Sequence, residues 1–251
     1  SDVYKRQLYN RPLNESIGNG TSSNIHGIAS FTHQHFNQHD LHSFWDKYNI
    51  TYTSNITSIG IFSNISGVGE TQLDIEYLTG ISQNIETQSW YIPFSDDCFL
   101  RWTIDVNNAE FPVSDLFSIS FSSPEIIEGN SYMIRVNQEL AKMVAKGITL
   151  FFASGDSGSE AVSCTYSNGI NTANFPATSP YVTAVGGLMN NMLPEQAWIN
   201  GGAGFSQLFK RPYWQNKSVI NYLNYAQSNN LLPINISIIG NYSNRAIPDI
   251  S

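Results

Sequence analysis

The sequence has 251 residues, of which 41% are hydrophobic and 13% are charged, a composition typical of a folded globular protein. The net charge of -8 and the pI near 5.0 argue against a nucleic-acid partner, because no basic surface is available to neutralise phosphates. No run of about 18 apolar residues occurs, so we expect no membrane span. Residues 1–7 contain no apolar signal segment.

The first third of the chain predicts a strand at residues 27–32 and exposed strand or loop at residues 49–66. A helix is expected at residues 40–48, because spacings of three, four and seven put its large apolar side chains on one stripe. These side chains are Leu41, Phe44, Trp45 and Tyr48.

A second helix, at residues 70–78, carries two acidic residues. Its Leu73, Tyr77 and Leu78 are available for the core. Glu70 and Asp74 are four residues apart and therefore share a face of the helix. Two such carboxylates repel each other, and in a poorly hydrated cleft one of them would keep its proton, which gives a base that works in acid. The alternative is a solvated acidic face.

The clearest pattern of the chain is a strand at residues 116–121, a helix at residues 132–146 and a strand at residues 148–153. Gly147 ends the helix. The apolar face of the helix consists of Met133, Val136, Leu140, Met143 and Val144. Strand, helix, strand predicts a right-handed parallel crossover. With a further strand at residues 181–185 and no repeats, we expect one α/β domain with a parallel sheet.

The strand at residues 148–153 leads into the glycine-rich turn SGDSG, residues 154–158, which carries Asp156. Catalytic groups of open α/β sheets lie in such loops, at the carboxyl ends of strands. Glycines such as Gly155 also let a substrate backbone approach closely. Asp156 is therefore a candidate site residue, and the alternative is a turn that Asp156 caps through its own backbone.

All five histidines lie within seventeen positions: His26, His33, His35, His39 and His42. The His-x-His spacing of His33 and His35 allows a metal site, but the segment is polar and loop-like. We expect a surface cluster without metal.

Eight Asn-x-Ser/Thr sequons are candidate glycosylation sites, a mild excess for this composition that favours the secretory pathway. They begin at Asn14, Asn19, Asn49, Asn55, Asn64, Asn216, Asn235 and Asn241. The two cysteines, Cys98 and Cys164, form no disulfide framework, and either could lack its partner in this chain.

Five segments, in order from about Leu8 to the end of the chain, resemble the sedolisin family of serine-carboxyl peptidases. They are GETQLDIEYL, YMIRVNQELAKMVAKGITLFFASGDSG, FPATSPYVTAVGG, NGGAGFSQLFKRPYWQ and RAIPDIS. The resemblance implies a subtilisin-like α/β fold, in which helices flank both faces of a parallel sheet.

The resemblance also implies roles for individual residues. Glu70 would be the general base of a serine nucleophile, Asp74 would hold Glu70, and Asp156 would donate a hydrogen bond to the oxyanion. Ser120, Phe121, Ser122 and Gly155 would bind substrate, the first three by pairing with its backbone. A carboxyl group donates a hydrogen bond only while it is protonated, and a carboxylate is a useful base only in acid, so an acidic optimum is expected.

The sequence also departs from the family pattern. Residues 1–7 match nothing in the family and need not be native, and residues 8–251 would be a partial catalytic domain without the prosegment. The nucleophile, in a Ser-Gly-Thr-Ser motif, and the calcium ligands would lie beyond residue 251, so this fragment would be inactive alone. Ser122 replaces a usual glycine, His33 stands where relatives often carry a glutamate, and Cys164 comes later than the family's cysteine.

The expected function is an acid serine-type peptidase that releases tripeptides from free N-termini of peptides and proteins. The alternatives are an endopeptidase of the same family and a catalytically dead glycoprotein on the same scaffold. The expected partners are peptide or protein substrates and the protein's own prosegment. The expected location is the lysosome or another acidic vacuole, with secretion as the alternative.

Overall fold

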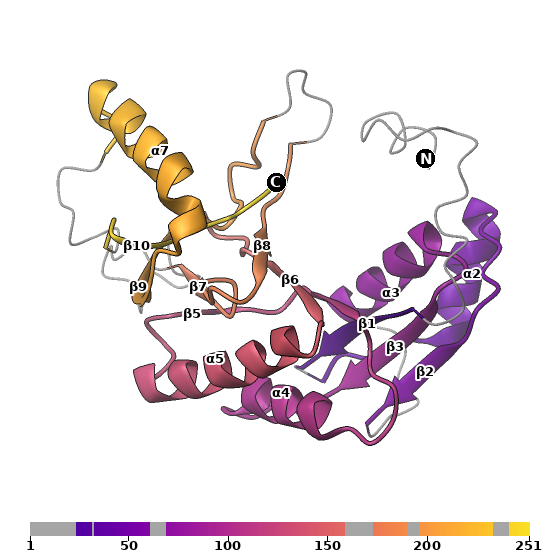
Figure 1. The fold of residues 1–251 in the computed structure, drawn as a ribbon. Coiled ribbons are helices and arrows are strands. Elements are labelled where there is room, and N and C mark those ends of the chain that lie inside the picture. The colour runs from indigo at the N-terminus through magenta and orange to yellow at the C-terminus, as the bar shows by residue number, and fades with distance from the viewer. Residues whose placement is uncertain (1–23, 32, 61–68, 159–172, 190–195, 233–240) are drawn as a thin grey trace. The chain divides into compact units, whose positions relative to one another are not determined.

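The computed structural model describes residues 24–31, 33–60, 69–158, 173–189, 196–232 and 241–251 (Figure 1). The chain divides into two compact units that alternate along the sequence. The first comprises Ser1–Cys98 and Ala109–Ser118, and the second comprises Phe99–Asn108 and Ile119–Ser251.

The first unit contains four parallel strands in the order β2-β3-β1-β4. Their bounds are β1 Ile25–Ser30, β2 Ile56–Ile59, β3 Glu86–Tyr91 and β4 Leu116–Ile119. In the register of the two inner strands, Ile25 lies opposite Glu86 and Ser30 lies opposite Tyr91. Parallel neighbours need crossover connections, and two helices supply them, α2 (Gln38–Tyr48) and α3 (Gly69–Ile81).

Both helices of the first unit pack on the sheet through one apolar cluster. Ile28 of β1, Leu41 of α2 and Ile75 of α3 are its fully buried centre. Phe36, Trp45, Ile56 and Leu78 pack around that centre. The prediction that Leu41 faces the core is confirmed, whereas Tyr48 is 53% exposed.

The core face of α3 differs from the predicted one. Leu73 and Tyr77 are exposed, and Thr71, Ile75 and Thr79 are buried instead. Thr79 can be buried because its hydroxyl donates to the Ile75 carbonyl at 2.6 Å and accepts from Trp45 Nε1 at 3.0 Å. A threonine whose hydroxyl is paired inside costs little, so hydrophobicity alone missed this stripe. Leu78 packs against the core as predicted, and only Leu73 and Tyr77 were misplaced.

The second unit contains the parallel pair β6 (Thr149–Ala153) and β8 (Thr183–Val185), and two antiparallel pairs. The antiparallel pairs are β5 (Ser123–Pro124) with β7 (Asn174–Phe175), and β9 (Gly204–Lys210) with β10 (Asn244–Ile247). The helices are α4 (Cys98–Asn108), α5 (Asn130–Ala145), the short 3₁₀ helix η1 (Tyr213–Gln215) and α7 (Asn216–Ser228).

Helix α5 matches its prediction closely. Met133, Val136, Leu140 and Met143 are buried, and Val144 is 39% exposed because the helix ends there. Gly147 has φ +92° and donates its N–H to the Val144 carbonyl at 2.9 Å, as expected of a C-terminal glycine. Helix α4 packs on the same core, where Trp102 meets Phe152 of β6 edge-on.

The α/β fold with parallel strands and flanking helices is thus confirmed. Among the residues that the structure describes, no helix is both long enough and apolar enough to cross a membrane.

Candidate active site

Glu70 lies in the first turn of α3, and neighbouring loop residues hold that turn in place. Gln34 Oε1 accepts the Thr71 N–H at 3.3 Å and lies close to Gly69, which has φ +63°. Gln72 Oε1 accepts the Asn37 N–H at 2.8 Å. The start of α3 is therefore tied, at Thr71 and Gln72, to the loop between β1 and α2.

Glu70 and Asp74 are one helical turn apart, and both are half-buried. The Oδ2 atom of Asp74 is shielded from solvent. On α3 the two carboxyl groups lie between the buried stripe of Thr71, Ile75 and Thr79 and the exposed Leu73 and Tyr77.

Two of the five histidines are buried, so the expected surface cluster is wrong for them. His26 on β1 is 6% exposed, its Nε2 lies 2.6 Å from Thr87 Oγ1, and burial lowers its pKa to about 4. His35 packs on Tyr91 with ring centroids 4.0 Å apart, and burial, together with the nearby charge of His33, lowers its pKa. The described part of the chain contains no group of three or more His, Cys, Asp or Glu residues that could hold a metal ion.

His33, which stands where relatives often carry a glutamate, is exposed and adopts φ +58°. Its Nδ1 lies 3.3 Å from the hydroxyl of Tyr91, and its ring lies 6.3 Å from that of Phe94. Among the described residues, the neighbours of the His33 ring are thus the aromatic side chains of Tyr91 and Phe94.

Asp156 lies in the loop that directly follows β6, as predicted, and its side chain is exposed. The loop has two glycines in left-handed conformations, Gly155 with φ +117° and Gly158 with φ +62°. Main-chain bonds hold it on both sides of Asp156. They run from Gly202 N to Gly155 O (2.6 Å), from Gly158 N to Asn200 O (2.9 Å) and from Ala203 N to Gly158 O (3.0 Å). A fixed backbone thus presents an exposed carboxyl group.

The segment Ser120–Phe121–Ser122 is half-buried and lies between β4 and β5. The predicted strand at residues 116–121 ends at Ile119, so this segment forms no strand among the described residues. It continues directly into β5, which pairs with β7 in the same unit as Asp156.

The predicted residues therefore fall into two groups. Glu70 and Asp74 lie together in the first unit, whereas Ser120, Phe121, Ser122, Gly155 and Asp156 lie in the second. Cys98 is buried at the start of α4, and Cys164 lies outside the described residues. Four sequon asparagines are exposed, Asn49, Asn55, Asn216 and Asn241, and the other four, Asn14, Asn19, Asn64 and Asn235, lie outside the described residues.

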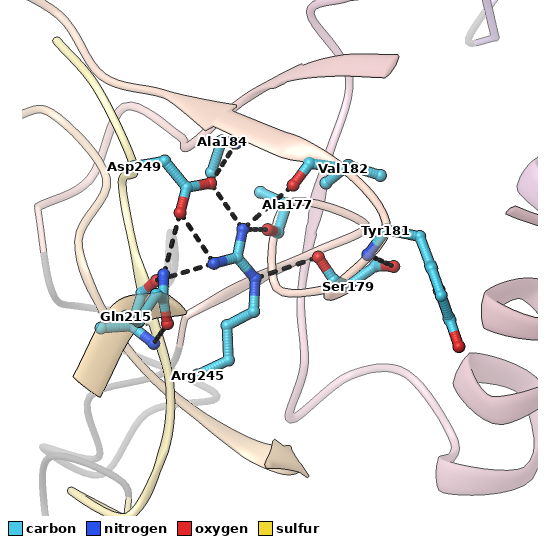
Figure 2. A network of polar contacts seen from close by, with 9 residues as sticks. Ala177, Ser179, Tyr181, Val182, Ala184, Gln215, Arg245 and Asp249 are labelled. Atoms are coloured by element: carbon cyan, nitrogen blue, oxygen red, sulfur yellow. Dashed lines mark hydrogen bonds and ion pairs between the residues drawn. The ribbon is translucent and has the colours of Figure 1, made fainter. Parts of the chain in front are cut away.

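Sequence reasoning missed a polar network around Arg245 (Figure 2). The Arg245 side chain is 1% exposed and binds both carboxylate oxygens of Asp249, at 2.8 and 2.6 Å. Its remaining bonds go to main-chain carbonyl groups of Ala177, Ser179, Val182 and Ala246. This buried charge is therefore both paired and hydrogen-bonded.

The network ties β10 and the following residues to β8. Asp249 Oδ2 accepts the Ala184 N–H at 2.8 Å, and the Asp249 N–H donates to the Ala184 carbonyl at 2.8 Å. Gln215 Nε2 donates to Asp249 Oδ1 at 2.8 Å. Burial alone would raise the pKa of Asp249, but the hydrogen bonds and charge of Arg245 hold it below the ordinary value. Both residues lie in RAIPDIS, but only the fold reveals their partners.

A second missed group is Glu125, which follows β5 and is 2% exposed. Its carboxylate accepts the Ser206 hydroxyl at 2.7 Å and the Gln207 N–H at 2.6 Å. Burial raises the pKa of Glu125, and the hydrogen bonds from Thr178, Ser206 and Gln207 offset part of that effect. Glu125 thus links the segment after Ser122 to β9.

Comparison with known proteins gives a consistent result. No family model matches the chain. Tripeptidyl-peptidase 1 of Macaca fascicularis and that of Homo sapiens are each 34% identical to it over 259 residues. These alignments cover 98% of this chain and 44% of the relatives, so the chain spans less than half the length of the curated relatives it matches.

Among solved structures, Pseudomonas sedolisin, a serine-carboxyl proteinase, matches with a TM-score of 0.62 and 20% identity, over 92% of this chain and 66% of that one. This match shows the fold. The chain is therefore similar in sequence to part of tripeptidyl-peptidase 1 and has the fold of a sedolisin serine-carboxyl proteinase.

Proposed function

We propose that the protein carrying this chain is an acid serine-carboxyl peptidase that releases tripeptides from free N-termini. The observation that carries the proposal is the 34% identity to tripeptidyl-peptidase 1 along 98% of the chain. The half-buried Glu70 and Asp74, one helical turn apart, and the exposed Asp156 in a glycine-rich loop after β6 support it.

In the proposed reaction, a serine hydroxyl attacks the scissile carbonyl carbon and its proton passes to Glu70. Asp74 orients Glu70 from the next turn of α3. Protonated Asp156 donates a hydrogen bond to the oxyanion of the tetrahedral intermediate. Glu70 then gives the proton to the departing amine, and a water molecule hydrolyses the acyl-enzyme with Glu70 again as base.

The proposal places the nucleophilic serine in a part of the protein outside these 251 residues, so this chain by itself is expected to be inactive. The calcium ion that the family resemblance implies would likewise be bound outside this chain. The described residues offer no cluster suited to it, and no step here passes through a metal.

Peptides and proteins are the proposed substrates, and the protein's own prosegment is a proposed partner. Catalysis that needs protonated Asp156 suits the lysosome or another acidic vacuole, and secretion is the alternative location. Both locations allow glycosylation at the exposed sequons.

The test is an assay of the full-length protein on a tripeptide reporter with a free N-terminus, between pH 3 and pH 8. We expect an acidic optimum. The matched control is the same reporter with an acetylated N-terminus, which an exopeptidase should not cleave because it recognises the free ammonium group.

A neutral optimum would contradict the proposal. Equal cleavage of the blocked and free reporters in acid would retain the acid peptidase and replace the exopeptidase with an endopeptidase. No cleavage at any pH by folded, full-length protein would favour the catalytically dead glycoprotein.

A further inference from the structure

Asn174, in the short strand β7, contacts the loop that carries Asp156. Its Nδ2 donates to the Ser154 carbonyl at 3.1 Å. It also lies directly against Gly155, where an added Cβ would come within 1.9 Å of that nitrogen. Position 155 therefore accepts only glycine, because the Asn174 amide occupies the space that a Cβ would need.

Gly202 packs against the same two loop residues as Asn174. A Cβ at Gly202 would lie 2.0 Å from the Ser154 carbonyl oxygen, and the Gly202 N–H already donates to the Gly155 carbonyl at 2.6 Å. Residues 154 and 155 are thus held by two contacts, one from the Gly202 main chain and one from the Asn174 side chain. Asp156, the next residue, is the first that is free to face solvent.

The strand of Asn174 is paired with the continuation of Ser120–Phe121–Ser122. Pro124 lies opposite Asn174 and Ser123 lies opposite Phe175. The Glu125 N–H adds a bond to the Ala173 carbonyl at 3.0 Å. Asn174 therefore connects the segment expected to bind substrate backbone with the loop expected to stabilise the oxyanion.

From these contacts we infer that Asn174 is a positioning residue that sets the location of Asp156 relative to bound substrate. This inference rests on the proposed function. Asn174 acts through the loop and does not itself touch the reacting atoms. An oxyanion donor must lie within about 0.5 Å of its productive position, so a loosened loop should lower turnover more than binding.

The test compares Asn174→Ala with wild type in the full-length protein at its acidic optimum. We expect kcat to fall by about 10-fold to 100-fold with KM changed less than about threefold. Asn229→Ala is the matched control, because Asn229 Nδ2 also donates to a main-chain carbonyl, that of Tyr225 at 2.8 Å, on exposed α7. The control should keep wild-type kcat.

A double-mutant cycle with Asp156→Ala separates positioning from general structure. If Asn174 works through Asp156, Asn174→Ala should cost less than about twofold in the Asp156→Ala background. The same loss in both backgrounds would overturn the inference and assign Asn174 a structural role.

Asn174→Asp keeps the shape of the side chain and guards against a variant that fails to fold. A protonated aspartic acid can donate to the Ser154 carbonyl, whereas an ionised one repels it, so this variant should be active in acid and lose activity with rising pH sooner than wild type. A pH profile identical to wild type would overturn the inference.

The inference and the proposed function can fail separately. An inactive Asp156→Ala together with a fully active Asn174→Ala would overturn the inference alone. A fully active Asp156→Ala would overturn the oxyanion role and, with it, the positioning role.

Discussion

The charged residues of this chain are few, and the structure gives most of the buried ones a definite partner. Glu70 and Asp74 stand apart because they lie half-buried, one turn apart, at a helix start that is hydrogen-bonded to the loop between β1 and α2. We attribute this placement to the proposed role of Glu70 as general base.

Glu70→Gln tests that role. The amide keeps the size of the side chain but cannot accept the serine proton, so kcat of the full-length protein should fall by about 10² to 10⁴-fold. The measurement is steady-state turnover of the tripeptide reporter in acid. Glu76→Gln is the matched control on the same helix, where Glu76 accepts a hydrogen bond from Gln72 at 2.7 Å. Equal, near-wild-type turnover of both variants would remove Glu70 from the mechanism.

His26 makes a prediction about stability. Its folded pKa of about 4 lies below the ordinary value of 6.5, so the folded state binds fewer protons than the unfolded state. Stability is therefore unaffected above about pH 6.5 and falls as the pH drops toward 4, by about 3 kcal/mol.

His26→Gln keeps a partner for Thr87 but does not titrate. Denaturant unfolding at pH 7 and pH 4 should show that the variant loses less stability in acid than wild type. His39→Gln, at an exposed position on α2, is the control and should behave as wild type. An unchanged loss in His26→Gln would show that the histidine is not responsible.

At the scale of elements, the ends of β6 and β8 carry the functional loop and its support. The Asp156 loop follows β6, and the Arg245–Asp249 ion pair fixes the chain after β10 along β8. The N–H of Gly186, just after β8, donates to the Ile250 carbonyl at 2.7 Å. The ion pair therefore holds the edge of the sheet at which the proposed chemistry takes place.

Asp249→Asn should destabilise the protein, because it leaves the guanidinium of Arg245 buried without a counter-charge. We expect a loss of about 3 to 5 kcal/mol at neutral pH. The folded pKa of Asp249 is below its ordinary 3.8, so the ion pair contributes fully above pH 3.8 and is lost as the pH falls through the lower folded value. The pair thus persists in the acidic range of the proposed activity.

Denaturant unfolding of wild type and Asp249→Asn at several pH values checks this. The difference in free energy of unfolding should be constant from pH 5 to pH 7 and shrink below pH 3.8. Asp115→Asn, which replaces an exposed aspartate, should change stability by less than about 1 kcal/mol. A difference that persists unchanged in strong acid would contradict the assigned ion pair.

At the scale of the whole molecule, the spacing of apolar residues predicted those helices and strands whose buried side chains are hydrophobic. Helix α5 and strand β6 are examples, and the glycine pattern also located the Asp156 loop. Strand β3 was missed because its sequence, ETQSWY, is polar, yet Thr87, Gln88 and Ser89 are buried. Gln88 Oε1 accepts both the N–H and the hydroxyl of Ser114 at 3.0 Å. These residues are far apart in the sequence, so local sequence patterns do not predict this contact.

The same limit applies to the candidate site. The acids of the site could be found because they follow recognisable motifs, whereas their supports could not. The supports are Asn174, Glu125 and the Arg245–Asp249 pair, and they contact residues 20 or more positions away or main-chain groups. The spacing of residues along the sequence does not predict such contacts.

The most direct test of the central claim is the turnover of Asp156→Ala in folded, full-length protein in acid. Loss of an oxyanion donor should reduce kcat by about 10² to 10³-fold without unfolding the protein, because the Asp156 side chain is exposed and main-chain bonds hold its loop. Asp156→Asn, which donates at every pH, should retain more activity and extend it toward neutral pH. If Asp156 were only a turn cap, Asp156→Ala would lose about 1 kcal/mol of stability and keep its activity. Turnover of Asp156→Ala within a few fold of wild type would contradict the account.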